Sequence, residues 1–482
     1  MPGNSIVIVG ASSLGCELAL EARKAGFPVT LIDEHPQSIK AMSNDAPYYY
    51  GNGLPAALQN RVAVNEAVLG SNERLIDCLE TGVDVHTGTV AWGAFQSSPN
   101  NLHVGQPKVG IVSGEGNELV AYDHLVIAAG ARDFVPSFRG WELPGVFGVK
   151  AGRKLLTSYQ CYDGTRTLIL GTTAEAVAFA REAREKGVEI AGFVEPGSVA
   201  QAGADDLSWI KSEAIEIFFG TVIEGANGKT SVTSASLVST SAGGDTRDIA
   251  CDTICAAVGT LPNIELPSAM GCELAFSTRF GTWLPATSAS LETTRPNVYW
   301  LSSFTRGSGQ ARTILAAIQG HSESLPAAAI DGDPERSPAD YLRLWIKSLL
   351  RAGGRNVSLC QCETVTRGEL LDLSPPKYLG QGLRRPKSPI LAAAEGARID
   401  QDAVKRMTRV GMGHCQGKRC RDEAALLLSE ETGVPLERIK PATYRFPVRP
   451  IDLALIAAED DTPDTRELWP HWLEPYVQQA GE

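Results

Sequence analysis

Residues 5–34 read SIVIVGASSLGCELALEARKAGFPVTLIDE, and the architecture of the N-terminal half follows from them. Residues 5–9, which are apolar from Ile6 onward, predict a strand, the turn at residues 10–15 leads into an amphipathic helix, and residues 29–32 predict a second strand. Glu34 ends this second strand, where an acidic side chain can bind a ribose hydroxyl. The strand–turn–helix–strand order followed by an acid predicts a Rossmann dinucleotide-binding unit.

The glycine fingerprint in this turn is incomplete. Gly10 and Gly15 stand at the first and last glycine positions of G-x-G-x-x-G, but Ser12 occupies the middle position. A glycine is needed there because the backbone must approach a pyrophosphate closely, and a Cβ displaces the phosphate or requires a shifted loop. We therefore predict a degenerate nucleotide site lined by Gly10, Ser12, Gly15 and Glu34.

Two later segments extend this pattern. Residues 122–131 form an apolar strand that runs into Ala-Ala-Gly-Ala, which resembles the second flavoenzyme motif and implies that Gly130 lies beside the cofactor. Residues 166–195 repeat the strand–turn–helix–strand order, but only Gly171 remains of the glycine pattern. Glu175 adds a negative charge in the first turn of that helix, where phosphate would bind. We expect this second Rossmann-like unit to be a scaffold without NAD(P)H.

Helical periodicity indicates two further elements. Residues 60–80 predict one helix, and residues 338–351 predict another that follows a charged, proline-rich linker. In the first helix, the expected core positions are Val64, Val68, Leu75, Ile76 and Leu79.

Four of the ten cysteines form two close blocks near the C-terminus. Cys360 and Cys362 are separated by one residue, and Cys415 and Cys420 by four. Four thiolates suffice for a zinc ion or a [2Fe–2S] cluster, and both remain open on spacing alone. Disulfides fit less well, because the chain shows no signal peptide and no small secreted-domain character. The glycines near Cys415 can turn backbone amides toward the sulfurs, and they are Gly411, Gly413 and Gly417.

The cysteine blocks carry a family resemblance. Cys-x-Cys-Glu followed by Gly-Met-Gly-x-Cys-Gln-Gly-x-x-Cys resembles the bacterioferritin-associated-ferredoxin-like [2Fe–2S] module. More narrowly, it resembles that module fused to the alpha subunit of multi-subunit opine oxidases, hydroxyproline or proline dehydrogenases and hydrogen cyanide synthase. Residues 444–451 resemble the segment that closes the module. The resemblance implies that one [2Fe–2S] cluster is ligated by Cys360, Cys362, Cys415 and Cys420.

This chain departs from the family pattern at three places. A basic, proline-rich insertion at residues 374–387 lengthens the stretch between the cysteine blocks. Residues 38–43 and 302–304 replace segments that usually surround a flavin. These departures leave three alternatives open for the nucleotide site: it holds FAD loosely, it holds another adenine nucleotide, or it is empty.

Composition limits the class of protein. The chain has 482 residues, 43% hydrophobic and 21% charged, with a net charge of −12, which is typical of a multidomain globular protein. No apolar run approaches the roughly 20 residues that span a bilayer. Residues 336–421 hold 17 Lys or Arg and 7 Asp or Glu, a net of +10. No aromatic stacking pattern or DNA-binding motif accompanies this charge, so we expect an acidic partner subunit rather than nucleic acid.

The expected fold is a two-dinucleotide-binding-domain flavoprotein core with a small C-terminal α-helical [2Fe–2S] domain. The predicted order is a first dinucleotide-binding domain in two parts (1–150 and 266–330), an inserted Rossmann-like domain (151–265), a linker and helix (331–355), the cluster module (356–460) and a tail (461–482).

The sequence indicates no catalytic residue, because it contains no nucleophile–base pair, no paired acid–base carboxylates and no Cys-x-x-Cys. In the family that it resembles, an FAD-containing beta subunit oxidises the C–N bond of an opine or imino acid. We therefore expect a cytoplasmic electron-transfer and structural alpha subunit that binds such a catalytic subunit, with or without a small third subunit. Two alternatives are a glycine-oxidising hydrogen cyanide synthase subunit and a non-redox zinc scaffold.

Overall fold

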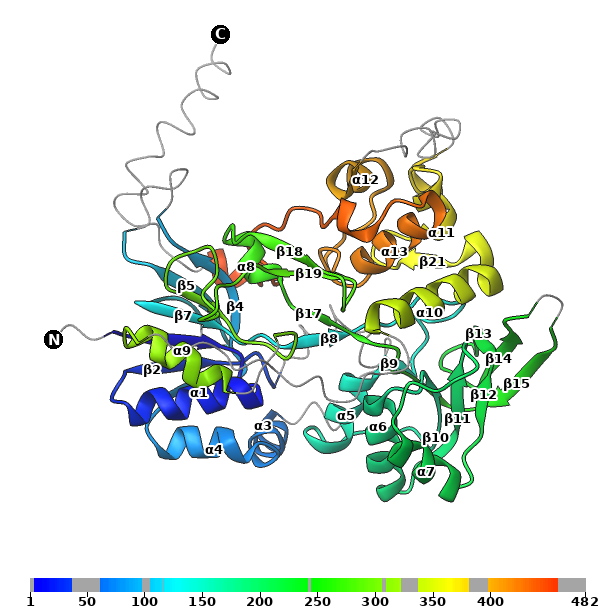
Figure 1. Ribbon diagram of the computed structural model, residues 1–482, viewed down its shortest axis with the longest axis horizontal. Coiled ribbons are helices and arrows are strands. Elements are labelled where there is room, and N and C mark those ends of the chain that lie inside the picture. The colour runs from blue at the N-terminus through cyan, green and yellow to red at the C-terminus, as the bar shows by residue number, and fades with distance from the viewer. Residues whose placement is uncertain are drawn as a thin grey trace, which may run out of the picture.

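A computed structural model defines the fold over the described residues, which are 4–36, 61–97, 105–114, 116–241, 244–305, 309–321, 337–380 and 398–457. The two largest sheets are five-stranded and parallel, with helices and smaller sheets packed around them (Figure 1). The fold class is therefore mixed α/β, as two Rossmann-like units require. Residues 38–43, the insertion beyond Gly380 and the tail 461–482 lie outside the described residues.

The first sheet contains the N-terminal Rossmann unit. Its strand order is β20-β7-β1-β2-β3, for β1 (Ile6–Val9), β2 (Val29–Ile32), β3 (Asp84–His86), β7 (His124–Ile127) and β20 (Val298–Trp300). Ile6 and Ile8 share a hydrophobic cluster with residues of α1 (Ser13–Lys24), α4 (Glu73–Glu80) and α9 (Gln310–Ile318). Val7 belongs to a second cluster, which includes residues of β4 (Val90–Phe95) and β5 (Lys108–Val112). Burial on both faces explains the unbroken apolar run at residues 6–9.

One helix prediction is wrong in part. Residues 61–80 form two helices, α3 (Arg61–Gly70) and α4, because Asn72 caps the second helix through its side chain. The interruption resets the helical phase. Consequently Ile76 and Leu79 are 36% and 45% exposed, and the prediction that they face the core is wrong, whereas the other three predicted core residues are buried.

The second sheet contains the inserted Rossmann-like unit. Its strand order is β12-β11-β10-β16-β9, for β9 (Val146–Gly148), β10 (Arg166–Leu170), β11 (Glu189–Glu195), β12 (Ile217–Phe219) and β16 (Thr253–Ala256). Helices α5 (Val149–Thr157), α6 (Ala174–Glu185) and α7 (Ala204–Ser212) share one hydrophobic cluster with this sheet. The antiparallel pair β8 (Ala131–Asp133) and β17 (Thr260–Pro262) joins the two units.

The C-terminal cysteine module packs against the second sheet. It begins with α10 (Pro338–Gly353), which the sequence predicts closely, and continues through β21 (Ser358–Cys360), β22 (Val365–Thr366), α11 (Arg367–Leu371), α12 (Gln401–Thr408) and α13 (Arg421–Thr432). Residues of α10, α11 and α13 share one hydrophobic cluster with Leu168 and Leu170 of β10. The module and the second sheet therefore form a common core.

A buried ion pair crosses the same junction. Arg367 and Glu423 lie 3.7 Å apart, and their side chains are 1% and 2% exposed. Glu423 also accepts a hydrogen bond from Ser137 N at 2.9 Å, and Arg367 donates to the Ser137 carbonyl. The backbone between the two Rossmann units is thus held by two charged side chains of the cysteine module.

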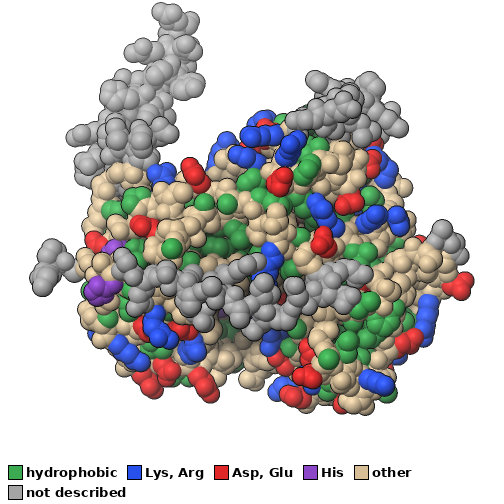
Figure 2. All heavy atoms as spheres, viewed as in Figure 1, with side chains coloured by type: hydrophobic (Ala, Val, Ile, Leu, Met, Phe, Trp, Pro, Cys, Tyr) green, Lys and Arg blue, Asp and Glu red, His purple; other side chains and the backbone are tan. Residues whose placement is uncertain are grey.

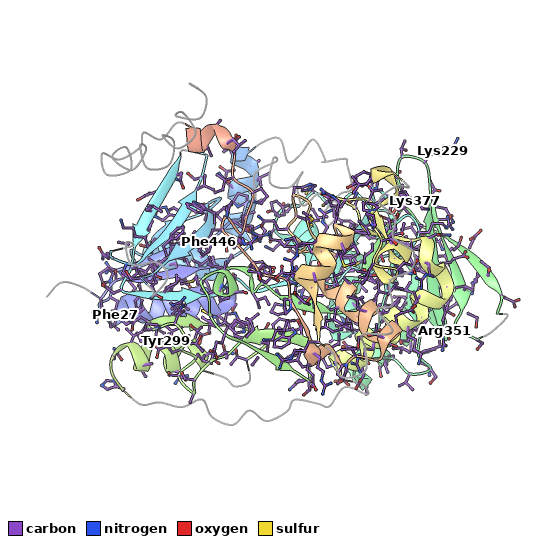
Figure 3. The ribbon with its side chains drawn as sticks, turned by 90° about the horizontal axis from the view of Figure 1, so that it is seen from above. Phe27, Lys229, Tyr299, Arg351, Lys377 and Phe446 are labelled. Carbon is purple, nitrogen blue, oxygen red and sulfur yellow. The ribbon has the colours of Figure 1, made fainter. Side chains whose placement is uncertain are left out.

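Lys and Arg side chains gather at the top of the cysteine module on the face drawn in Figure 2. Figure 3 shows Phe446 among the elements of the first unit, although it belongs to the C-terminal part of the cysteine module in sequence. Among the helices in the described part of the chain, none combines the length and apolar character needed to cross a membrane.

Candidate functional site

A cavity of about 630 Å³ opens at the carboxyl ends of the first sheet's strands. Its lining includes four of the predicted nucleotide-site residues, namely Gly10, Ser12, Glu34 and Gly130. This is the place where Rossmann units bind nucleotides. Gly15 does not line the cavity: a Cβ at that residue would lie 2.1 Å from the Gly10 carbonyl oxygen, so Gly15 permits close packing of α1 on the strand.

Polar contacts inside the protein already engage the nucleotide turn. Ser12 Oγ accepts a hydrogen bond from Gly15 N at 3.2 Å and thereby caps α1. Asp33 accepts from Ala11 N at 2.6 Å, so this carboxylate closes the turn. Glu34, the predicted ribose ligand, accepts from Arg449 Nη2 at 2.9 Å. Sequence reasoning missed Arg449, although it lies in the 444–451 segment that carries part of the family resemblance.

The described residues that line the cavity have a positive electrostatic balance. Seven of them are Lys or Arg and five are Asp or Glu, which favours an anionic ligand. Lys154 projects from α5 into this lining, and burial lowers the pKa of its ammonium, opposed by Asp33 and Glu34. Burial also lowers the pKa of His35 to about 4, and one ring nitrogen of this residue lies 2.9 Å from Tyr159 Oη.

The four module cysteines are brought together in two pairs, each formed across the two sequence blocks. The Cys360 and Cys420 thiols share a hydrogen bond, and so do the Cys362 and Cys415 thiols. Cys360, Cys415 and Cys420 are buried, whereas Cys362 is half-buried and lies 3.6 Å from His414 Nε2. The hydrogen bond with Cys362 lowers the pKa of Cys415 to about 5.

Backbone amides point at these sulfurs, as the glycine pattern predicts. Cys360 receives hydrogen bonds from the amides of Gly411 and Glu363, and Cys415 receives them from Gly417 and Arg419. Gly411 and Gly417 have φ of +79° and +77°, which L side chains rarely adopt. Such N–H donors stabilise negative charge on sulfur.

A third glycine admits the close approach of the two blocks. A Cβ on Gly413 would lie 2.2 Å from the Cβ of Cys362. Within the described ranges, no three or more His, Cys, Asp or Glu side chains are placed to hold a single metal ion. A [2Fe–2S] cluster does not require such a group, because each of its two irons takes two thiolates and shares bridging sulfides. The arrangement of the four cysteines in two pairs, with amide donors beside them, fits two thiolates for each iron.

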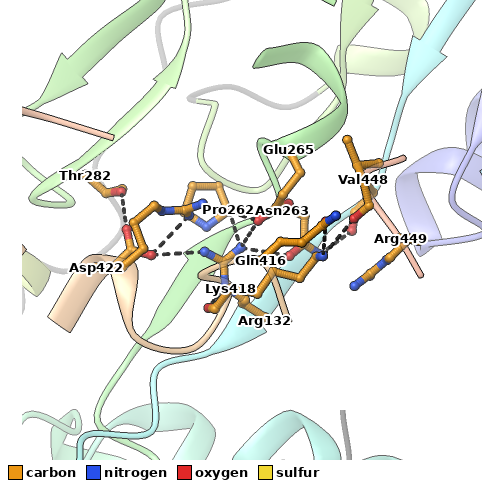
Figure 4. A network of polar contacts seen from close by, with 12 residues as sticks. Arg132, Pro262, Asn263, Glu265, Thr282, Gln416, Lys418, Asp422, Val448 and Arg449 are labelled. Carbon is orange, nitrogen blue, oxygen red and sulfur yellow. Dashed lines mark hydrogen bonds and ion pairs between the residues drawn. The ribbon is translucent and has the colours of Figure 1, made fainter. Parts of the chain in front are cut away.

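A polar network connects the loop between Cys415 and Cys420 to the cavity (Figure 4). Arg132 lies at its centre and donates to the Lys418 carbonyl at 3.0 Å, to Glu265 at 2.9 Å and to Asp422 at 3.0 Å. Burial raises the pKa of Glu265, but four cations outweigh it and lower this pKa to about 2, in decreasing order Arg132, Arg421, Lys418 and Arg449. The network joins β8, the start of α8 (Glu265–Ala269) and the loop between Cys415 and Cys420.

In the second Rossmann-like unit, side chains of the protein itself contact the turn and the acidic strand end. Glu195 ends β11 where a ribose-binding acid would stand, and it is fully buried. It accepts hydrogen bonds of 2.6 Å from Tyr341 Oη and from Thr172 Oγ1. Thr172 N, in the phosphate-binding turn, donates to Tyr341 Oη at 3.2 Å. Tyr341 of α10 therefore occupies both the phosphate and the ribose contacts of this turn.

Comparisons with known proteins agree with this architecture. Residues 4–320 match the family described as pyridine nucleotide-disulphide oxidoreductase, and residues 390–460 match the sarcosine oxidase A3 domain. Subunit HcnB of the hydrogen cyanide synthase of Pseudomonas aeruginosa is 25% identical, over 92% of this chain and 96% of its own length. One subunit of the opine oxidase of Agrobacterium tumefaciens is 22% identical, over 94% of this chain and 91% of its own length.

A solved structure shows the same fold. The L-proline dehydrogenase of P. horikoshii has a TM-score of 0.60 at 16% identity, covering 94% of this chain and 79% of that chain. The predicted family resemblance and the predicted flavoprotein-type α/β fold are thus confirmed. The [2Fe–2S] cluster and the roles of its four ligands stay predictions.

Proposed function

Because this chain belongs to the pyridine nucleotide-disulphide oxidoreductase family, we propose that it is the electron-transfer and structural subunit of a flavin-dependent dehydrogenase complex. In this proposal, an FAD-containing partner subunit oxidises the C–N bond of an opine, imino acid or amino acid. The observation that carries the proposal is the convergence of the four module cysteines in two amide-lined pairs. A one-electron carrier needs another redox group to deliver electrons, which implies such a partner.

Cys360, Cys362, Cys415 and Cys420 would hold the [2Fe–2S] cluster, which supplies one-electron transfer when bound. The chain's own contribution is to keep these thiols paired and to direct the amides of Gly411, Gly417 and their neighbours at them. Those donors favour the thiolate form that iron requires. The carbonyl of the buried Leu349 and the backbone of Ser137 bind Arg367, which fixes the module against the rest of the chain.

The cavity would hold FAD or another adenine nucleotide. Its lining supports this assignment through Gly10 in the turn, Glu34 at the ribose position and an excess of cations for phosphate. Three carboxylates of the cavity are already engaged by groups of this chain, which supports the assignment of substrate oxidation to the partner. Asp33 closes the turn, Glu34 pairs with Arg449 and Glu265 pairs with Arg132.

Two names among the relatives bear on the substrate. The opine oxidase and hydrogen cyanide synthase relatives both align with nearly the whole chain, so a glycine-oxidising complex is the second candidate. Residues 336–421 carry a net positive charge, and its exposed cations would attract an acidic partner with a strength that should fall as salt rises.

The experiment uses the chain alone and co-expressed with its neighbouring subunits. Anaerobically purified chain should contain about two irons and two acid-labile sulfides. Stoichiometric zinc without labile sulfide would establish the scaffold alternative instead. Dye-linked oxidation of opines, proline, hydroxyproline or glycine should appear only in the complex, and robust turnover by the isolated chain would overturn the assignment of catalysis to a partner.

Matched variants sharpen this experiment. Cys415→Ala should abolish iron retention and uncouple substrate oxidation from cluster reduction. Cys255→Ala removes an equally buried thiol from β16 in the second sheet, so iron content should be unchanged. If both variants lost iron equally, the loss would reflect general instability rather than ligation.

A further inference from the structure

Two segments of the cysteine module form a wall of the nucleotide cavity. One is the cysteine loop, residues 416–419 between Cys415 and Cys420, which contributes Lys418 to the lining. The other is the strap, residues 446–449, which contributes Val448 and Arg449. The cavity is therefore built by the N-terminal Rossmann unit and the cysteine module together.

The strap is anchored to the first unit. Val448 is 5% exposed, and its N–H donates to the Trp92 carbonyl of β4 at 2.8 Å. The Phe446 ring lies 5.0 Å from the Phe95 ring between centroids. Arg449 then reaches the predicted ribose ligand Glu34. The strap thus holds a fixed position beside the nucleotide turn.

The cysteine loop is bonded directly to this strap. Gln416 Nε2 donates to the Pro447 carbonyl at 2.9 Å, and Lys418 Nζ donates to the Val448 carbonyl at 2.7 Å. Lys418 is only 6% exposed, and its carbonyl accepts from Arg132. A continuous set of contacts therefore runs from the residue after Cys415 to the nucleotide turn.

We propose that binding of an anionic nucleotide in this cavity and reduction of the cluster oppose each other, with Lys418 and the strap as the coupling elements. This inference rests on the proposed function, because it assumes a cluster on the four cysteines. Lys418 is three residues from Cys415 and two from Cys420, and three residues span at most about 11 Å. Buried charges at such separations are screened far less than exposed ones.

The sign of the coupling follows from charge. A phosphate drawn to Lys418 places negative charge near the cluster, and reduction adds one more negative charge there. The bound nucleotide therefore stabilises the oxidised state and lowers the midpoint potential. By linkage, reduction weakens nucleotide affinity by the same factor.

The experiment measures both sides of this linkage on the purified full chain, with ADP as the probe. Reductive titration followed by visible absorbance gives the midpoint potential with and without saturating ADP. We expect ADP to bind about fivefold more weakly to the reduced chain, near the lower end of typical couplings. That factor corresponds to a potential lower by about 40 mV, since tenfold is 59 mV for one electron.

Variants of two lysines that line the cavity distinguish a loss of the coupling between nucleotide and cluster from a loss of nucleotide binding. Lys418→Met should remove most of the ADP-induced shift. Lys150→Met is the matched control, because Lys150 lines the cavity from α5 and pairs with Glu175 at 3.3 Å, away from the cysteine loop. At saturating ADP, this variant should keep the full shift even if its affinity falls.

Each contrary result has a distinct meaning. Chain that lacks iron and labile sulfide overturns the proposed function and this inference together. Chain that carries the cluster but fails to bind ADP, or binds it without any shift in potential, overturns the inference alone. Equal loss of the shift in Lys418→Met and Lys150→Met would also overturn it, because the cysteine loop would then have no special part.

Discussion

Replacing Gly413 with alanine is the most direct perturbation of the cysteine cluster. The added methyl group would lie 2.2 Å from the Cβ of Cys362 and 3.4 Å from its Cα, whereas real Cβ atoms essentially never come closer than 3.0 Å. Either the loop or Cys362 must therefore move by roughly 1 Å, against a tolerance of about 0.2 Å for metal–ligand distances. Overpacking of this kind costs about 1–3 kcal/mol, so cluster retention should fall by roughly five- to 150-fold.

The assay measures iron and labile sulfide per chain after anaerobic purification, and the rate of iron loss to a chelator. Gly70→Ala is the control, because a Cβ at that helical position meets no atom within 4 Å. Far-UV circular dichroism should show that both variants keep their secondary structure. If Gly413→Ala retained a full complement of iron and lost it at the wild-type rate, the assignment of Cys362 to the cluster would be refuted.

Three further predictions concern the contacts that hold the domains together. Tyr341→Phe removes a hydroxyl that donates a hydrogen bond to the buried Glu195, so urea denaturation should show a free energy of unfolding lower by about 1–3 kcal/mol. Tyr378→Phe is the control, because Tyr378 is 57% exposed and also donates to a carboxylate, that of Glu363. Its effect should be much smaller, and equal effects in the two variants would contradict the prediction. Arg367→Met leaves Glu423 buried without its cation and should cost about 3–5 kcal/mol, while Arg247→Met in an exposed pair should cost at most about 1 kcal/mol. A comparable loss of stability in the two variants would show that the buried ion pair contributes no more than the exposed one. The pKa of Glu265 is lowered from 4.5 to about 2, so its stabilising contribution is present above pH 4.5 and is lost as the pH falls through 2. The free energy of unfolding should decline over that window, and Glu265→Gln should flatten the decline; an unchanged slope would rule out this carboxylate as the cause.

The hydrogen bonds of Tyr341 at the turn of the second Rossmann-like unit indicate a structural role for that turn. The missing glycines predicted a scaffold without NAD(P)H, but they did not indicate which side chains engage the turn. Tyr341 engages Glu195 and Thr172 N, so helix α10 and the cysteine module are anchored at this turn. The same helix shares its hydrophobic cluster with β10.

Local patterns in the sequence were sufficient for the elements of the fold and for part of the site. Three elements depend on periodicities that span a few residues: the apolar run at residues 6–9, the repeat at residues 166–195 and the helix that starts at Pro338. The glycines around Cys415 were informative because positive φ and close approach are local backbone requirements. The helix prediction at residues 60–80 failed because one cap at Asn72 outweighed a continuous apolar pattern.

Contacts between segments far apart in the sequence could not be predicted from such local patterns. Arg449 reaches Glu34 across 415 residues, and Tyr341 reaches Glu195 across 146. These pairs form because apolar faces of separate units pack in one particular arrangement, and that packing is a property of the whole chain rather than of any local repeat. The sequence therefore identified the cysteines, the nucleotide turn and the family, while folding alone brought the strap and the cysteine loop to the nucleotide cavity.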